Sequence, residues 1–152
     1  MLLLAPGPVP LSPELAAIAQ VTHPPYFRGE VFVRLMLDLT ADLRMIFRTR
    51  ATPLTVTSSG TGLMEMAIVN LLNPGDRVVV VNGGSFGLRW VQMCRTFRAE
   101  VTEFRVPPGR SPDLDALAES IPVGATALLV NAHETSTGNL YDLERIGRIA
   151  RE

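Results

Sequence analysis

The 152 residues contain no lysine, so all fourteen basic side chains are arginines. A Walker-type phosphate loop requires a Gly-Lys pair, and this class of nucleotide site is therefore excluded. The one cysteine, Cys94, excludes an internal disulfide framework and fits a reducing compartment. The two histidines lie far from Cys94 and from each other in the sequence, so we expect no metal site.

Long hydrophobic runs and an excess of either charge are absent as well. No segment approaches the roughly 20 apolar residues that a membrane helix needs. The N-terminus has too short an apolar run for a signal peptide and lacks a basic leader. A net charge of −1 gives no electrostatic footprint for nucleic acid. The sequence therefore predicts a soluble, cytoplasmic chain without nucleic-acid or membrane partners.

Residues 1–50 are predicted to form an N-terminal arm with two helices. Ser12, Pro13 and Glu14 supply a cap, a first-turn proline and an acid, which favours a helix through Gln20. A second helix is expected over residues 30–47, where apolar residues recur at helical spacing and charges occupy the other face.

Residues 51–152 alternate between strand-like and helix-like segments. The expected strands are 54–57, 77–82, 101–106 and 125–131, and the expected helices are 62–72, 86–98, 112–119 and 143–152. This order predicts an α/β fold of three layers, α/β/α, with a mostly parallel sheet. Four strands followed by a helix would leave an apolar sheet edge bare. We therefore expect residues 51–152 to be the first part of a larger domain that is truncated here.

The turn at residues 58–62 lies between a predicted strand and a predicted helix. The start of a helix presents unpaired backbone N–H groups and the positive end of the helix dipole. Ser59 and Thr61 add hydroxyl donors, so the turn is suited to a phosphate group. The motif lacks the third glycine of a dinucleotide fingerprint, and no acid follows at the distance needed to hold a ribose.

Two further turns of small and hydroxyl residues, 82–87 and 131–138, follow predicted strands. The carboxyl ends of parallel strands meet at one rim of a sheet, so the three turns predict a shared ligand pocket. The second turn also matches the GxSxG pattern of a hydrolase, with Ser85 as the nucleophile and Asp115 and His133 in the order of a triad. Only one strand precedes this turn, where hydrolases of that class have several. Without that role for Ser85, Phe86 could stack on a flat cofactor ring.

Taken together, these turns resemble the class V aminotransferases of the pyridoxal-phosphate fold-type I superfamily, and the alanine/serine–glyoxylate group in particular. The resemblance covers nearly the whole chain in order. It is carried by residues 4–9, 59–65, 70–76, 82–90 and 133–138.

The resemblance implies a pyridoxal-phosphate transferase-like large domain and a role for several residues. Ser59, Gly60 and Thr61 would bind the cofactor phosphate, and Phe86 would stack on the pyridine ring. Ser136 would lie beside the ring and its phenolic oxygen. Pro6 and Gly7 would approach the substrate side of the pocket. None of these residues would be catalytic, because the family's Schiff-base lysine lies beyond Glu152.

The function implied is transfer of an amino group from a small amino acid, alanine or serine, to glyoxylate or pyruvate, with a homodimer as the complete protein. The 152 residues alone would not catalyse this reaction, since arginine cannot replace the lysine. Two alternatives stay open at this point: a serine hydrolase using Ser85, and a non-catalytic half-domain that assembles with another chain.

Overall fold

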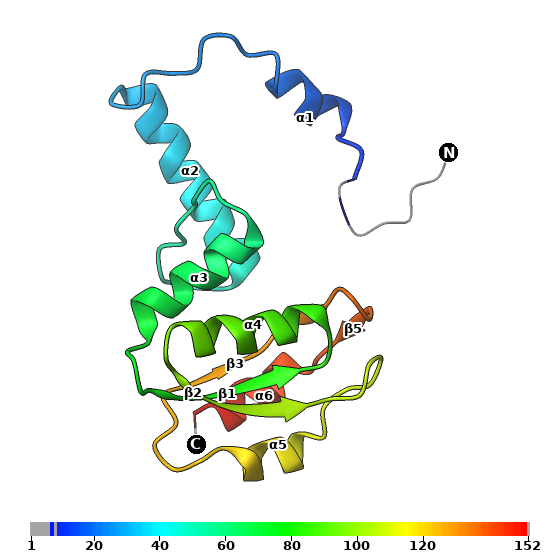
Figure 1. The fold of residues 1–152 in the computed structure, drawn as a ribbon. Coiled ribbons are helices and arrows are strands. Elements are labelled where there is room, and N and C mark those ends of the chain that lie inside the picture. Colours follow the sequence, from blue (N-terminus) through cyan, green and yellow to red (C-terminus); the bar gives the residue numbers. More distant parts are fainter. Residues whose placement is uncertain (1–6, 8, 152) are drawn as a thin grey trace. The chain divides into compact units, whose positions relative to one another are not determined.

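The computed structural model describes Gly7 and residues 9–151 (Figure 1). The chain divides into two compact units between Thr57 and Ser58. The first unit contains α1 (Pro13–Ile18) and α2 (Glu30–Phe47). Ser12 caps α1 by accepting a hydrogen bond from Leu15 N at 3.3 Å, as the sequence predicted. The bounds of α2 equal the predicted ones.

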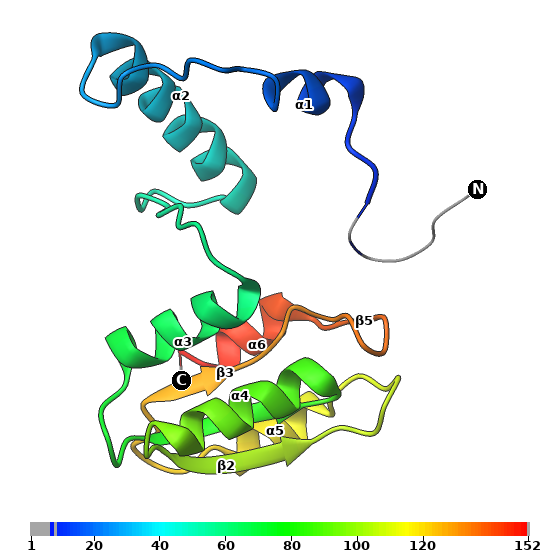
Figure 2. The ribbon, with the colours of Figure 1, turned by 45° about the horizontal axis from the view of Figure 1, so that its top comes forward.

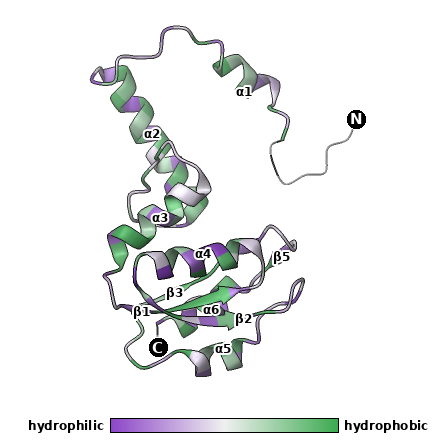
Figure 3. Ribbon diagram, in the orientation of Figure 1, coloured by the Kyte–Doolittle hydropathy of each residue, from purple (hydrophilic) through white to green (hydrophobic). Residues whose placement is uncertain are grey.

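The second unit is built on a parallel sheet of three strands in the order β2-β1-β3. Its strands are β1 (Arg77–Asn82), β2 (Glu100–Arg105) and β3 (Ala127–Leu129), and β1 pairs in parallel with both others. Val78, Val79 and Val80 are fully buried, and β1 is coloured as hydrophobic in Figure 3. The apolar central strand is therefore covered on both faces, as expected for a parallel sheet.

Four helices form the outer layers of this unit. Helices α3 (Gly60–Leu71) and α4 (Ser85–Thr96) cover one face, and α5 (Leu114–Ser120) and α6 (Leu143–Ile149) cover the other (Figures 1 and 2). The predicted three-layer α/β/α fold is confirmed.

Alternate residues of β1 point into two separate cores, because successive side chains of a strand face opposite sides. Val78 and Val80 pack with Ile68 of α3 and with Val91 and Cys94 of α4. The second core joins the other β1 valines to α5 and α6, with the buried members Val79, Val81, Val106, Leu114, Leu117, Tyr141 and Ile146.

Two strand predictions need correction. Residues 54–57 form no strand, because no strand in the described part of the chain pairs with them, and a strand requires a ladder partner. Residues 125–131 form a shorter strand than predicted, since only Ala127–Leu129 pairs with β1. The sequence reasoning also missed an antiparallel hairpin in the third turn, β4 (His133–Glu134) with β5 (Asn139–Leu140).

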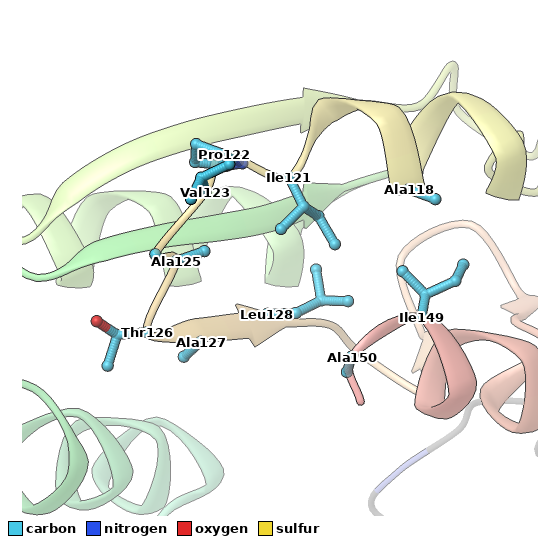
Figure 4. Close-up of a pocket in the computed structure, with 11 residues that line it drawn as sticks. Ala118, Ile121, Pro122, Val123, Ala125, Thr126, Ala127, Leu128, Ile149 and Ala150 are labelled. Carbon is cyan, nitrogen blue, oxygen red and sulfur yellow. The ribbon is translucent and has the colours of Figure 1, made fainter. Parts of the chain in front are cut away.

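The outer edge of β3 has no neighbouring strand among the residues that the structure describes. A pocket of about 430 Å³ lies along this edge between α5 and α6, with Ile121, Leu128 and Ile149 in its lining (Figure 4). A second apolar pocket, of about 260 Å³, borders β3 next to α3. None of the described helices has both the length and the apolar character needed to cross a membrane.

Candidate functional site

The N-terminus of α4 is closed by a buried carboxylate. Glu134 of β4 is 1% exposed. Its Oε2 accepts a hydrogen bond from Gly87 N at 2.9 Å, and its Oε1 accepts one from Phe86 N at 3.3 Å. Asn131 Nδ2 donates to Oε2 at 3.2 Å. A negative charge at a helix N-terminus satisfies unpaired N–H groups and complements the helix dipole.

The surroundings of Glu134 keep it ionised. Burial raises the pKa of this carboxyl, but the hydrogen bonds from Ser136, Gly87 N, Phe86 N and Ser136 N together lower it below its ordinary value. No cationic side chain forms a salt bridge with Glu134 in the described structure. The charge is therefore balanced by oriented N–H and O–H dipoles and by the helix end.

The Ser136 hydroxyl belongs to the same network. It donates to Glu134 Oε1 at 2.5 Å and accepts from Ser85 N at 3.0 Å. Its only proton is thus committed to Glu134, and toward a ligand it could act only as an acceptor. The neighbouring Thr135 is exposed, and its hydroxyl has no protein partner in the described part of the chain.

Close packing around this network requires glycine at two positions. A Cβ on Gly84 would collide with the Ser136 hydroxyl and the Glu134 carboxyl group. A Cβ on Gly87 would lie 2.7 Å from the Cα of Asn82 and 2.8 Å from the backbone oxygen of Val81. The turn after β1 is therefore held rigidly against β4.

The N-terminus of α3 is open, in contrast to that of α4. Ser59 caps it by accepting a hydrogen bond from Gly62 N at 3.1 Å, which leaves the Ser59 hydroxyl proton free. Gly60 N and Thr61 N have no hydrogen-bond partner in residues 9–151, and a Cβ on Gly60 would meet no atom within 4 Å. The start of α3 thus has two unpaired N–H groups and a free hydroxyl proton at the positive end of a helix.

The starts of α3 and α4 are joined through one arginine. Arg89 Nη1 donates to Thr61 Oγ1 at 2.6 Å. The guanidinium carbon of Arg89 also lies 5.0 Å from the centre of the Phe86 ring, within cation–π range. The structure therefore brings Ser59, Gly60, Thr61, Phe86 and Ser136 to the starts of α3 and α4, and their role in binding a cofactor stays a prediction.

For two predicted site residues, Pro6 and Gly7, the expected place near the substrate stays a prediction. Pro6 lies outside the described residues. Gly7 is exposed and belongs to the first unit, so its expected place on the substrate side stays a prediction.

The hydrolase triad is not assembled. Asp115 forms an ion pair with Arg145, and its side chain is 82% exposed. No described hydrogen bond links Ser85 with His133 or His133 with Asp115. Ser85 is the first residue of α4, and its backbone N–H is held by Ser136. Close packing accounts for both glycines of the GxSxG pattern, because a Cβ on Gly83 would collide with Tyr141 and a Cβ on Gly87 with the backbone of β1. The hydrolase alternative therefore has no geometric support.

A model of the aminotransferase class-V family matches residues 20–152 of the chain. The chain belongs to this family. Its members depend on pyridoxal 5′-phosphate, so the resemblance inferred from the turns is confirmed, together with the cofactor that it implied.

Individual relatives match the chain over almost its whole length. The soluble hydrogenase 42 kDa subunit of Anabaena cylindrica is 33% identical over 100% of the chain and 40% of its own length. The alanine–glyoxylate aminotransferase of Rattus norvegicus is 33% identical over 97% of the chain and 36% of its own length. The solved alanine–glyoxylate aminotransferase of Nostoc sp. superposes with a TM-score of 0.88 at 31% identity, over 97% of the chain and 39% of that protein. The chain thus spans about two fifths of these relatives.

Sequence reasoning missed the two residues that organise the site, Glu134 and Arg89. A signal for Glu134 was present, because an acid that follows a buried apolar strand without a nearby basic partner needs another source of hydrogen bonds. Arg89 gave no such signal, since an arginine in an amphipathic helix is ordinarily a solvated surface residue.

Proposed function

We propose that this chain forms the cofactor-phosphate and ring-stacking part of an aminotransferase that moves an amino group from alanine or serine to glyoxylate or pyruvate. The observation that carries the proposal is the start of α3, where Gly60 N and Thr61 N are unpaired, the Ser59 hydroxyl proton is free, and a Cβ on Gly60 would meet no atom within 4 Å. The names of the class-V relatives that act on glyoxylate support the choice of substrates.

The donor set fits pyridoxal 5′-phosphate. A phosphate accepts hydrogen bonds from backbone N–H groups at a helix start, and the dipole of α3 adds a favourable potential. The α4 N-terminus is already neutralised by Glu134, so α3 is the helix end that remains for an anion. Phe86 presents an aromatic ring next to this position, with the Arg89 guanidinium over it, and an aromatic ring can stack on a flat ligand.

The remaining site residues would orient the ligand rather than react with it. The bound cofactor would supply the electron sink that makes a C–H bond next to an amino group acidic. Ser136 would contribute an acceptor beside the ring, and Thr135 would offer the hydroxyl donor that Ser136 cannot. The amine that moves the proton has to come from outside these 152 residues, because they contain no lysine.

Gly60→Ala in the complete protein tests this assignment. The added methyl group meets no protein atom within 4 Å, so the fold should be unaffected while the space for the phosphate is filled. We expect loss of bound pyridoxal 5′-phosphate after gel filtration, measured from the absorbance of the cofactor. Gly147→Ala in α6 is the matched control, since its new Cβ is also unobstructed. Unchanged cofactor content in Gly60→Ala would contradict the proposal.

Three further parts of the proposal rest on sequence and family alone. These are the homodimer, the cytoplasmic location and the place of Pro6 and Gly7 near the substrate. Reading the native gene beyond the codon for Glu152 separates the aminotransferase from the non-catalytic half-domain. A continuing frame with a lysine that follows a further strand supports the enzyme, and a stop codon supports the half-domain.

A further inference from the structure

Arg89 occupies an unusual position in the second unit. It is half-buried on α4, and its guanidinium contacts both Thr61 at the start of α3 and the ring of Phe86. In the described part of the chain it forms no salt bridge with a carboxylate. The first turn of α3 also contains no acidic residue. A partly desolvated cation without an anionic partner therefore lies beside an open helix N-terminus.

The bond between Arg89 and Thr61 fixes the role of the threonine hydroxyl. A guanidinium can only donate hydrogen bonds, so Thr61 Oγ1 is the acceptor at 2.6 Å. The hydroxyl proton of Thr61 must then point elsewhere, and no described protein group accepts it. Gly60 N and Thr61 N are unpaired at the same place. Arg89 thus makes the Thr61 hydroxyl a further donor beside these two N–H groups and the Ser59 hydroxyl.

The positive charge of Arg89 also favours an anion at the start of α3. The N-terminus of α3 carries a partial positive charge, and Arg89 adds a full one that is linked to it through a single hydroxyl group. A dianionic group at Gly60 and Thr61 would be attracted by both charges. The same ligand without its phosphate group would not be attracted in this way.

We propose that Arg89 is a positioning residue that selects the phosphorylated form of the cofactor. It acts by holding the Thr61 hydroxyl as a donor and by supplying the charge that a phosphate requires. The inference rests on the proposed function, because it takes the α3 N-terminus as the phosphate site. It adds a residue that lies outside the turn at residues 58–62. It also predicts that the site discriminates between phosphorylated and non-phosphorylated ligands.

The test measures binding rather than turnover. Pyridoxamine 5′-phosphate and pyridoxamine are titrated against the complete protein by equilibrium dialysis, because neither carries an aldehyde that could bond to an amine. We expect Arg89→Met to weaken pyridoxamine 5′-phosphate on the order of tenfold or more, since charge-assisted hydrogen bonds are the strong ones. Pyridoxamine should bind Arg89→Met and wild type equally. Arg89→Lys keeps the charge and should recover part of the loss.

A second variant separates the positioning role from a general effect on folding. Thr61→Val keeps the shape of the side chain and removes the hydroxyl, so it should reproduce the selective loss. When Thr61→Val is already present, Arg89→Met should weaken the binding of pyridoxamine 5′-phosphate by a smaller factor than it does in the wild-type protein, because the two residues act as one unit. Arg95→Met is the matched control, since Arg95 lies on the same helix and pairs with Glu103 instead. If Arg89→Met does not fold, the binding of the two ligands to Thr61→Val still tests the inference.

The outcomes distinguish this inference from the proposed function. If the wild-type protein does not prefer pyridoxamine 5′-phosphate over pyridoxamine, the α3 phosphate site itself is wrong. If wild type shows the preference and Arg89→Met keeps it, Arg89 plays no part in phosphate selection. An equal loss of both ligands in Arg89→Met would likewise overturn the inference, because Arg89 would then only support the ring of Phe86.

Discussion

Glu134 accepts a hydrogen bond of 2.9 Å from the backbone N–H of Gly87, although 47 residues separate the two positions in the chain. Through this bond β4 fixes the first turn of α4, which carries Phe86. Glu134 is the one buried charged residue in the part of the chain that the structure describes. The residue that carries the Phe86 ring is therefore held in place by a carboxylate from a distant part of the sequence.

Removing this carboxylate should destabilise the protein. We expect Glu134→Ala to lower the free energy of unfolding by about 3 kcal/mol, because buried N–H groups lose a charged acceptor. Glu134→Gln should cost about 1–2 kcal/mol, since one acceptor oxygen remains. Urea titration measures both values. Glu119→Gln, an exposed acid on α5, is the control and should change the stability by less than about 0.5 kcal/mol.

The same carboxylate predicts how stability depends on pH. The pKa of Glu134 is lowered in the folded state from an ordinary value of 4.5. A lowered pKa gives stability that is present above the unfolded-state pKa and is lost as the pH falls through the folded-state pKa. We therefore expect a decrease below about pH 4.5, measured by urea titration from pH 7 to pH 3. Glu134→Gln should flatten this decrease. An equally steep curve in that variant would assign the pH dependence to other acids, such as Glu103.

Tyr141 offers a substitution that should not harm the protein. Its hydroxyl is buried without a hydrogen-bond partner in the described structure, and the side chain is 4% exposed. An unsatisfied buried polar group costs free energy, so Tyr141→Phe should raise the stability by about 1 kcal/mol in a thermal or urea titration. The exposed Tyr26→Phe should leave the stability unchanged. A destabilised Tyr141→Phe would show that the hydroxyl has a partner.

Gly83 is coupled to the same tyrosine. A Cβ on Gly83 would collide with the Tyr141 hydroxyl, so Gly83→Ala should cost about 2 kcal/mol from overpacking. Combining it with Tyr141→Phe should recover part of this loss, because the colliding atom is removed and the two effects are not additive. A double-mutant cycle from urea titrations measures the coupling. Strict additivity would mean that Gly83 is required for another reason.

Cys94 should be inert in the folded protein. Its side chain is fully buried between β1 and α4, and burial raises the pKa of the thiol. The thiolate is the reactive form, so a thiol reagent should modify Cys94 only when the protein unfolds. The rate of modification in increasing urea should follow the unfolding transition. Rapid reaction in buffer alone would place the thiol at the surface.

The sequence was sufficient for the parts of the fold that local patterns determine. The bounds of α2 and β1 were predicted to the residue, because a helical apolar stripe and a valine run are unambiguous. Helix α5 was expected to begin at Pro112, directly after Ser111, but Asp113 is the cap and the helix begins at Leu114. Both residue types can cap a helix, so the pattern alone could not decide between them.

Long-range pairing explains most of what the sequence did not provide. Residues 54–57 have strand-like composition, yet they pair with none of the described strands. The place of Ser136 beside the cofactor ring stays a prediction, and the sequence did not indicate that its one proton is donated to Glu134. The link between Arg89 and Thr61 depends on how two helices pack, which their separate sequence patterns do not specify.

The distance in sequence between Glu134 and the start of α4 also bears on the order of folding. Strands β1 and β2 and helix α4 are consecutive and can assemble from contacts that are close along the chain. The α4 N-terminus, in contrast, gains its cap only when residues 134 and 136 arrive. Closing that long loop costs entropy, and the hydrogen bonds that offset this cost form only after the loop has closed. The ring-bearing turn is therefore expected to become ordered late, after the sheet that supports it has formed.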